Sequence, residues 1–156
     1  MLGEDRSHFW RLTGRQNLQF FAALVGLHGA VGRSAVSHAL DEVGLTAVAD
    51  RRVDRYSTGM RSRLAIARAL LGRPAVLLAD EPTRSLDPAS AVEVRDLVRR
   101  LARELGTAVL LATHDVHEAA ELADSVVVLA DGSVAARFDD GRTAADLADA
   151  VVGVSP

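Results

Sequence analysis

Residues 56–88 read YSTGMRSRLAIARALLGRPAVLLADEPTRSLDP, and three segments with different physical properties follow one another in this stretch. The first begins with Ser57 and Gly59 and continues as an Ala/Leu-rich helix that carries arginines, until Gly72 and Pro74 end it. A hydroxyl group beside the free N–H groups of a helix start favours an anion, because the helix dipole adds partial positive charge there. The first segment therefore predicts an anion-binding helix start.

The second segment is an apolar strand that ends in two acidic residues. Residues 76–79, Val-Leu-Leu-Ala, lie between breakers, which predicts a parallel strand that is buried on both faces. Asp80 and Glu81 follow at its carboxyl end, where open α/β sheets place their ligands. Because a buried charge is costly without a partner, we expect Asp80 to hold Mg²⁺, directly or through water, and Glu81 to polarise an attacking water.

The third segment, Pro82 to Pro88, is a tight connection that ends with an N-cap at Asp87 and proline at the first helical position. Together the three segments closely resemble the ATP-binding-cassette (ABC) ATPases. The matching motifs are the signature (LSGGQ) at Ser57, Thr58, Gly59 and Met60, the Walker B strand with its catalytic glutamate at Val76 to Glu81, and the D-loop at Arg84, Ser85, Leu86 and Asp87. Thr58 and Met60 depart from the consensus glycine and glutamine, but a YSTGM-type signature recurs among exporter-type members.

The chain contains no lysine, since all 18 of its basic residues are arginine. A P-loop, GxxxxGK[ST], needs a lysine that reaches the β- and γ-phosphates, so no P-loop is present. In ABC ATPases that motif precedes the signature by a long interval. The resemblance therefore implies the C-terminal portion of a cassette, through truncation, an internal start at Met1 or a split gene.

Residues 1–11 fall where the family has its Q-loop, whose glutamine meets the Mg²⁺ and the attacking water. No glutamine occurs there, and Gly3 or Glu4 takes the approximate place, with a frayed terminus as an equal alternative. Phe9 and Trp10 lie in the region that faces the transmembrane partner in the family. An aromatic anchor in a groove fits that role, and a plain core position for either ring is the alternative.

The segments before the signature predict two helices. Thr13 and Gln16 form a capping box for the first of them. The second runs roughly over residues 31–43 and stops at Gly44. With the signature helix, these two resemble the helical subdomain of an ABC ATPase.

The chain after residue 88 predicts a helix to about residue 105, a second buried strand over residues 107–112, and then Thr113, His114 and Asp115. This last triplet looks like the family's H-loop, whose histidine senses the γ-phosphate. The alternative is an N-cap by Thr113 or Asp115 beside an incidental histidine. Further on, Asp131-Gly132 between two apolar runs predicts a hairpin, and Thr143 with Asp146 predicts a capping box for a final helix.

The composition of the 156-residue chain indicates one globular domain, with 49% hydrophobic and 25% charged residues. A net charge of −3 gives no support for a nucleic-acid surface. Cysteine is absent, which excludes disulfides and thiolate metal sites. No apolar run reaches the length of about 20 residues that a membrane helix needs, and no secretory leader is evident, so we expect a cytoplasmic location.

The resemblance implies an ATP hydrolase that binds ATP and Mg²⁺ between two cassettes, which form a homodimer or heterodimer and drive a transmembrane permease subunit from the inner face of the membrane. The roles that it implies are γ-phosphate binding for Ser57 and Gly59, Mg²⁺ for Asp80, water orientation for Glu81, γ-phosphate sensing for His114, and dimer contact for Ser85, Leu86 and Asp87. Because the P-loop is absent, we expect the isolated chain to be inactive.

The expected fold class is α/β, a P-loop NTPase-type (ABC ATPase) parallel sheet flanked by helices. It is expected to be incomplete, with a helical and signature subdomain over about residues 12–72 and part of the catalytic core over about residues 73–156. One alternative is a non-catalytic half-cassette that lends its signature to a partner ATPase. A chromosome-maintenance or DNA-repair ATPase of the same superfamily is a further alternative, but it needs a long coiled-coil insertion that this chain has no room for.

Overall fold

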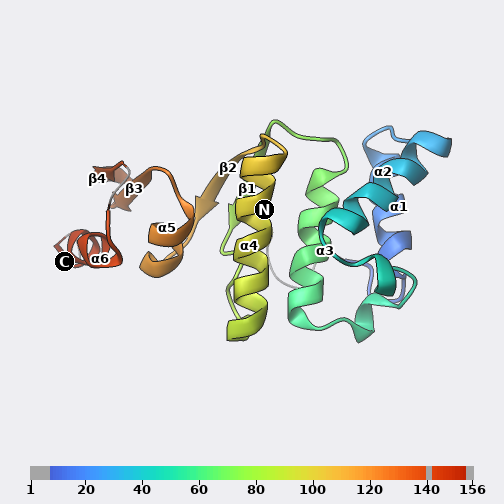
Figure 1. The fold of residues 1–156 in the computed structure, drawn as a ribbon, viewed down its shortest axis with the longest axis horizontal. Coiled ribbons are helices and arrows are strands. Elements are labelled where there is room, and N and C mark those ends of the chain that lie inside the picture. The colour runs from blue at the N-terminus through green and yellow to red at the C-terminus, as the bar shows by residue number, and fades with distance from the viewer. Residues whose placement is uncertain (1–7, 140–141, 154–156) are drawn as a thin grey trace. The chain divides into compact units, whose positions relative to one another are not determined.

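A computed structural model of the protein describes residues 8–139 and 142–153 (Figure 1). The chain forms two compact units, of which the first extends to Leu110 and the second begins at Leu111. The predicted boundary near residue 72 remains a prediction. Among the described residues, no helix is both long enough and apolar enough to cross a lipid bilayer.

The first unit begins with helices that pack on one another. They are α1 (Gly14–Leu24), α2 (Gly29–Glu42) and α3 (Thr58–Leu70), with two short 3-10 turns, η1 (Thr46–Val48) and η2 (Val53–Arg55), between α2 and α3. Helix α1 contacts both α2 and α3. The predicted capping box is confirmed, because the Thr13 hydroxyl accepts from the Gln16 N–H and the Gln16 side chain accepts from the Thr13 N–H.

The core of this helical region is dense. Leu18 of α1, Leu40 of α2 and Leu64 of α3 are each fully buried, and so are Leu45 and Val53 in the connection between α2 and α3. Burial of apolar side chains of this size contributes about 1.5–3 kcal/mol each. The helices that the pattern predicts are therefore held by one another as well as by their caps.

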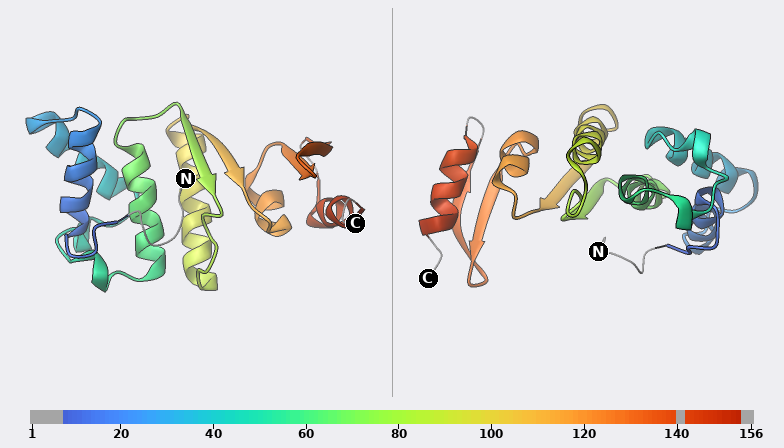
Figure 2. Two further views of the ribbon diagram at one scale, coloured as in Figure 1. Left: turned by 180° about the vertical axis from the view of Figure 1, so that it is seen from behind. Right: turned by 90° about the horizontal axis from the view of Figure 1, so that it is seen from below.

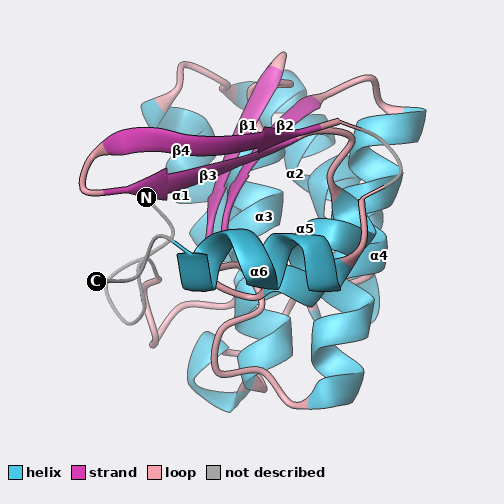
Figure 3. Ribbon diagram, turned by 90° about the vertical axis from the view of Figure 1, so that its left-hand side faces the viewer, coloured by secondary structure: helices cyan, strands magenta, loops and turns pink. Residues whose placement is uncertain are grey.

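Two strands and one long helix follow α3 in the chain. Strand β1 (Val76–Asp80) leads into helix α4 (Pro88–Glu104), which leads to β2 (Ala108–Ala112), and β1 and β2 form a two-stranded sheet (Figure 3). The N–H of Ala108 donates to the carbonyl of Ala75 at 2.9 Å. A helical crossover of this kind is the usual connection between parallel strands.

The prediction that β1 is buried on both faces is wrong. Leu77 and Ala79 are 2% and 3% exposed, whereas Val76 and Leu78 on the other face are 54% and 61% exposed. Leu110 of β2 is 66% exposed as well. The prediction rested on the apolar composition of residues 76–79, but burial of a strand depends on other elements that pack against both of its faces. In the described part of the chain, the second face of β1 is open.

The second unit combines a hairpin with two helices. Its elements are α5 (Val116–Leu122), β3 (Val126–Ala130), β4 (Ser133–Phe138) and α6 (Ala144–Gly153). The predicted Asp131-Gly132 turn joins the antiparallel pair β3–β4, and both turn residues have positive φ, at 49° and 74°. The capping box before α6 is also confirmed, since the N–H of Asp146 donates to the Thr143 hydroxyl and the N–H of Thr143 donates to the Asp146 carboxylate.

Candidate functional site

The predicted anion-binding segment is the start of α3. Ser57 is the N-cap, and its Oγ accepts from the Met60 N–H at 3.2 Å. Ser57 and Thr58 are exposed, Met60 is half-buried and Gly59 is buried. The capping bond uses Ser57 Oγ as an acceptor, so the hydroxyl proton is not consumed by it. The helix start is accessible, as an anion site requires.

Arg61 fixes the helix start to its surroundings. Its guanidinium donates to the Tyr56 carbonyl at 2.8 Å and to the Thr58 hydroxyl at 3.2 Å. The same group lies over the Trp10 ring, 5.3 Å from the ring centre, which is within cation–π distance. The arginine therefore places permanent positive charge one turn from Ser57, in addition to the charge of the helix dipole.

Gly59 brings α3 close to the start of α4, two helices that lie side by side in Figures 1 and 2. A Cβ atom at Gly59 would lie 2.7 Å from the Ser90 hydroxyl oxygen and 2.8 Å from its Cβ. Real Cβ atoms do not approach other atoms this closely, so glycine permits the contact. The signature segment and the helix that follows the D-loop are consequently in direct contact.

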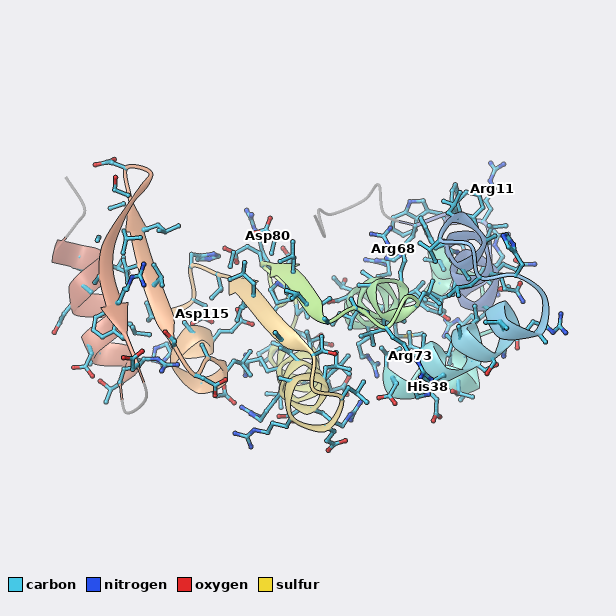
Figure 4. All side chains as sticks on the ribbon, turned by 90° about the horizontal axis from the view of Figure 1, so that it is seen from above. Arg11, His38, Arg68, Arg73, Asp80 and Asp115 are labelled. Atoms are coloured by element: carbon cyan, nitrogen blue, oxygen red, sulfur yellow. The ribbon has the colours of Figure 1, made fainter. Side chains whose placement is uncertain are left out.

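The acid pair lies at the end of β1, as predicted, and Figure 4 labels Asp80 there. Asp80 is exposed and Glu81 is half-buried. The argument that a buried acid pair needs a metal ion to offset its charge is therefore wrong for this structure, because water reaches both residues. A role for Asp80 in holding a metal remains a prediction from the motif alone.

The turn after Glu81 has unusual backbone geometry. Glu81 and Ser85 have positive φ, at 48° and 61°, which non-glycine residues adopt rarely. Within the turn, the N–H of Arg84 donates to the Glu81 carbonyl and the N–H of Leu86 donates to the Thr83 carbonyl, both at 3.1 Å. From outside the turn, the Ser62 hydroxyl of α3 donates to the Pro82 carbonyl at 3.0 Å.

Asp87, the last residue of the predicted D-loop, is the N-cap of α4, with Pro88 at the first turn as predicted. Its carboxylate accepts from the Ser90 N–H at 3.0 Å. Hydrogen bonds from Ser90, first from its side chain and then from its backbone, lower the pKa of Asp87 from the usual 3.8. The carboxylate is therefore ionised at neutral pH, on the same serine that Gly59 approaches.

The predicted H-loop lies in the second unit. His114 is exposed and stands between the end of β2 and the start of α5. Asp115 caps α5 by accepting from the N–H groups of His117 and Glu118, and the Asp115 N–H donates to the Thr113 hydroxyl at 3.1 Å. The capping alternative for Asp115 is thus realised, and it fixes the backbone on either side of His114. The role of His114 toward a phosphate remains a prediction.

The aromatic residues near the beginning of the chain form a surface cluster. Phe9 stacks edge-on against Phe20 with ring centres 4.7 Å apart, and Phe21 lies 6.0 Å from Phe9. Phe9 and Phe20 are 44% and 43% exposed, so Phe9 is no plain core residue. Buried Asn17 holds the Phe9 backbone at both its N–H and its carbonyl. The arrangement leaves aromatic surface open to a partner, while Trp10 is half-buried.

Gly3 and Glu4, the candidates for the Q-loop position, lie outside the described residues. Within the described residues, no cluster of three or more histidine or carboxylate side chains can hold a metal ion by itself. Mg²⁺ commonly uses only one or two protein carboxylates with phosphate oxygens and water, so Asp80 with an adjacent Glu81 fits that mode of binding.

Comparison with known proteins identifies the family of this chain. The sequence pattern of the ABC transporter family matches residues 1–84. The chain belongs to this family. It is 39% identical over 153 residues to the uncharacterised ABC transporter ATP-binding protein YdbJ of Bacillus subtilis, covering 98% of this chain and 49% of YdbJ. It is 45% identical to the daunorubicin resistance ATP-binding protein DrrA2 of Streptomyces coeruleorubidus, covering 86% of this chain and 39% of DrrA2.

Other members of the family extend the comparison to importers and to solved structures. The methionine import ATP-binding protein MetN of Thermobifida fusca is 39% identical over 91% of this chain and 44% of its own length. The cbiO1 subunit of the cbiONQ complex from Clostridium perfringens superposes with TM-score 0.79 and 32% identity over 86% of this chain and 53% of that chain. A dimeric ATP-binding cassette, MJ0796, bound to ADP and Pi, gives TM-score 0.73 and 27% identity over 88% of this chain and 61% of that chain.

These superpositions confirm the predicted fold class, that of an incomplete ABC ATPase cassette. The chain spans about half the length of the curated ABC relatives that it matches. The sequence reasoning did not find Ser62 and Ser90, which join the signature helix to the segment after Glu81. No local pattern reveals them, since each lies many residues from its partner in the chain.

Proposed function

We propose that the chain is part of the ATP-hydrolysing subunit of an ABC transporter and supplies the signature, Walker B, D-loop and H-loop segments. The observation that carries this proposal is the accessible, Arg61-flanked start of α3, held against the segment that follows Glu81. An exposed helix start with added positive charge suits the terminal phosphate of a nucleotide presented by another cassette. The hydrogen bond between α3 and Pro82 connects this helix start to the Walker B segment, as is useful in a site where phosphate binding must affect hydrolysis.

The proposed roles follow from the chemistry of each group. Ser57 and the N–H of Gly59 bind the γ-phosphate, and Ser85, Leu86 and Asp87 contact the second cassette. Bound Mg²⁺ supplies charge neutralisation for the phosphates, and Asp80 holds it, directly or through water. Glu81 accepts a proton from the water that it orients, and His114 donates a hydrogen bond to the γ-phosphate.

The chain alone is proposed to be inactive as an ATPase. It contains no lysine, and a P-loop needs one to reach the β- and γ-phosphates. The open apolar face of β1, with Val76 and Leu78 exposed, suits a sheet whose second face is covered by another layer of the cassette. The second candidate function is a non-catalytic half-cassette that lends its signature to a partner ATPase. The absence of lysine, and hence of a P-loop, supports this candidate as well.

The proposed partners are a second cassette, identical or different, and a transmembrane permease that holds the subunit at the inner face of the membrane. The exposed Phe9 and Phe20 rings supply an aromatic surface suited to such a permease. Export is the proposed direction, on the YSTGM form of the signature and on the similarity to the daunorubicin resistance protein. The methionine import protein has a comparable identity of 39%, so the proposal of export rests mainly on the form of the signature.

The experiment joins the chain to a cassette segment that carries a P-loop, taken from a full-length relative such as YdbJ, and measures ATP hydrolysis with Mg²⁺. We expect turnover that Glu81→Gln lowers at least about 100-fold, since general acid–base catalysis contributes about that much. Ser57→Ala is also expected to lower the turnover of the joined protein. The matched control is Ser37→Ala, which changes an exposed serine on α2 and is expected to have a smaller effect. Turnover that Glu81→Gln leaves unchanged would contradict the proposal.

A further inference from the structure

Two contacts join the signature helix α3 to the segment from Glu81 to Ser90. One is the hydrogen bond from the Ser62 hydroxyl to the Pro82 carbonyl, at 3.0 Å. The other is the close approach of Gly59 to Ser90, which no side chain larger than hydrogen permits. All of these residues belong to the first compact unit. The first turns of α3 are therefore held to the turn that follows Glu81 at two points, one at Pro82 and the other beyond the turn at Ser90.

The turn needs an external support, because its backbone is strained. Glu81 has φ of 48° and Ser85 has φ of 61°, and a non-glycine residue keeps such a conformation only where its surroundings fix it. The hydrogen bonds of Arg84 and Leu86 lie within the turn, so they set its internal shape. They do not set where the turn lies against α3. The Ser62 hydroxyl does so, and its acceptor is the carbonyl of the residue that directly follows Glu81.

We propose that Ser62 is a positioning residue for Glu81, which transmits the position of the signature helix to the carboxylate. This inference rests on the proposed function, in which Glu81 orients the attacking water. Pro82 is buried, and the hydrogen bond that its carbonyl accepts is partly buried. Removing the hydroxyl leaves that carbonyl without its partner on α3, so the peptide between Pro82 and Thr83, next in the chain to that of Glu81, gains freedom to rotate.

The consequence is a link between two functions within one cassette. An anion bound at Ser57 pulls on the first turn of α3, and Ser62 stands little more than one helical turn further along the same helix. A shift of that turn changes the position of the Pro82 carbonyl and with it the position of the adjacent Glu81. Occupation of the signature therefore sets the geometry of the water-orienting carboxylate on the same chain.

The first test measures amide hydrogen exchange in the chain as it is, with Ser62→Ala, Ser62→Thr and the control Ser37→Ala. The probe is the Arg84 N–H, which donates to the Glu81 carbonyl. We expect exchange about threefold to tenfold faster in Ser62→Ala, the factor that corresponds to one net hydrogen bond. Ser62→Thr keeps the hydroxyl and is expected to exchange at the wild-type rate, as is Ser37→Ala. Unchanged exchange at Arg84 in Ser62→Ala would overturn the proposal.

The second test uses the chain joined to a P-loop-bearing segment. Ser62→Ala is expected to lower kcat about tenfold with KM for ATP unchanged, and Ser62→Thr is expected to restore kcat. A merely structural role predicts no such split between kcat and KM. A kcat that Ser62→Ala leaves at the wild-type value overturns the positioning role. Absence of turnover in the unsubstituted protein counts against the proposed function instead, and the exchange measurement then still decides whether Ser62 holds the turn.

Discussion

The helices α1–α3 and the strands β1–β2 differ in how completely the chain covers their apolar residues. Leu18, Leu40 and Leu64 on the three helices are fully buried against neighbouring segments of the same unit. On β1, only the face with Leu77 and Ala79 is covered, and Leu78 on the other face is 61% exposed. A helix needs cover along one stripe, which a neighbouring helix supplies, whereas an interior strand needs cover on both faces. The described chain therefore completes its helical region and leaves its sheet open.

The largest expected effect contrasts one leucine from each region. Leu64→Ala is expected to lower the free energy of unfolding by about 3 kcal/mol, because it leaves a cavity in a closed core. Leu78→Ala is expected to change it by less than about 0.5 kcal/mol, because the side chain is already largely in water. Urea denaturation of both variants measures the difference. Equal losses would mean that the second face of β1 is covered in solution.

A second effect concerns the contact between α3 and α4. Gly59→Ala is expected to lower the free energy of unfolding by about 1–3 kcal/mol, because the new methyl group meets Ser90 at less than 3 Å. Adding Ser90→Gly is expected to recover much of this loss. Gly72→Ala is the control, since a Cβ there meets nothing within 4 Å. Thermal unfolding compares the variants, and an unaffected Gly59→Ala protein would show that the two helices are less closely packed.

A third effect tests the open strand face directly. Exposed apolar surface next to an unpaired strand edge promotes self-association. Leu78→Glu is expected to reduce the weight-average mass in sedimentation experiments at high concentration, with little change in the free energy of unfolding. Glu substitution of Leu64 is instead expected to prevent folding, because it buries a charge. A monomeric wild-type protein at all concentrations would contradict this prediction.

The smallest expected effect is the pH dependence of the cap on α4. The folded-state pKa of Asp87 lies below its unfolded value of 3.8, so the cap stabilises the folded protein above pH 3.8 and loses its contribution as the pH falls through the lower folded-state pKa. Asp87→Asn is therefore expected to lower the melting temperature slightly at pH 7, and the difference is expected to shrink below pH 3.8. A difference that stays constant with pH would exclude this electrostatic origin.

The sequence predicted the local features of the fold well. The caps at Thr13, Asp87 and Thr143 and the Asp131-Gly132 hairpin follow from hydrogen-bonding groups and backbone preferences a few residues apart. The motif order also identified the family before any comparison. Such features depend on neighbours in the chain, so they can be read directly from the residues.

The sequence could not predict features that depend on distant segments. An apolar run such as residues 76–79 shows what a strand can bury but not what covers it, and this produced the wrong burial of β1 and of the acid pair at Asp80. The Ser62–Pro82 hydrogen bond joins residues 20 positions apart, and an ordinary serine on a helix gives no indication of it. Tertiary packing decides both.

The most direct test of the central claim is ATP hydrolysis by the pure, unmodified chain with Mg²⁺. We predict no turnover above that of the Glu81→Gln variant, because the chain holds no lysine to bind the β- and γ-phosphates. Turnover by the isolated chain that disappears on Glu81→Gln would contradict the account.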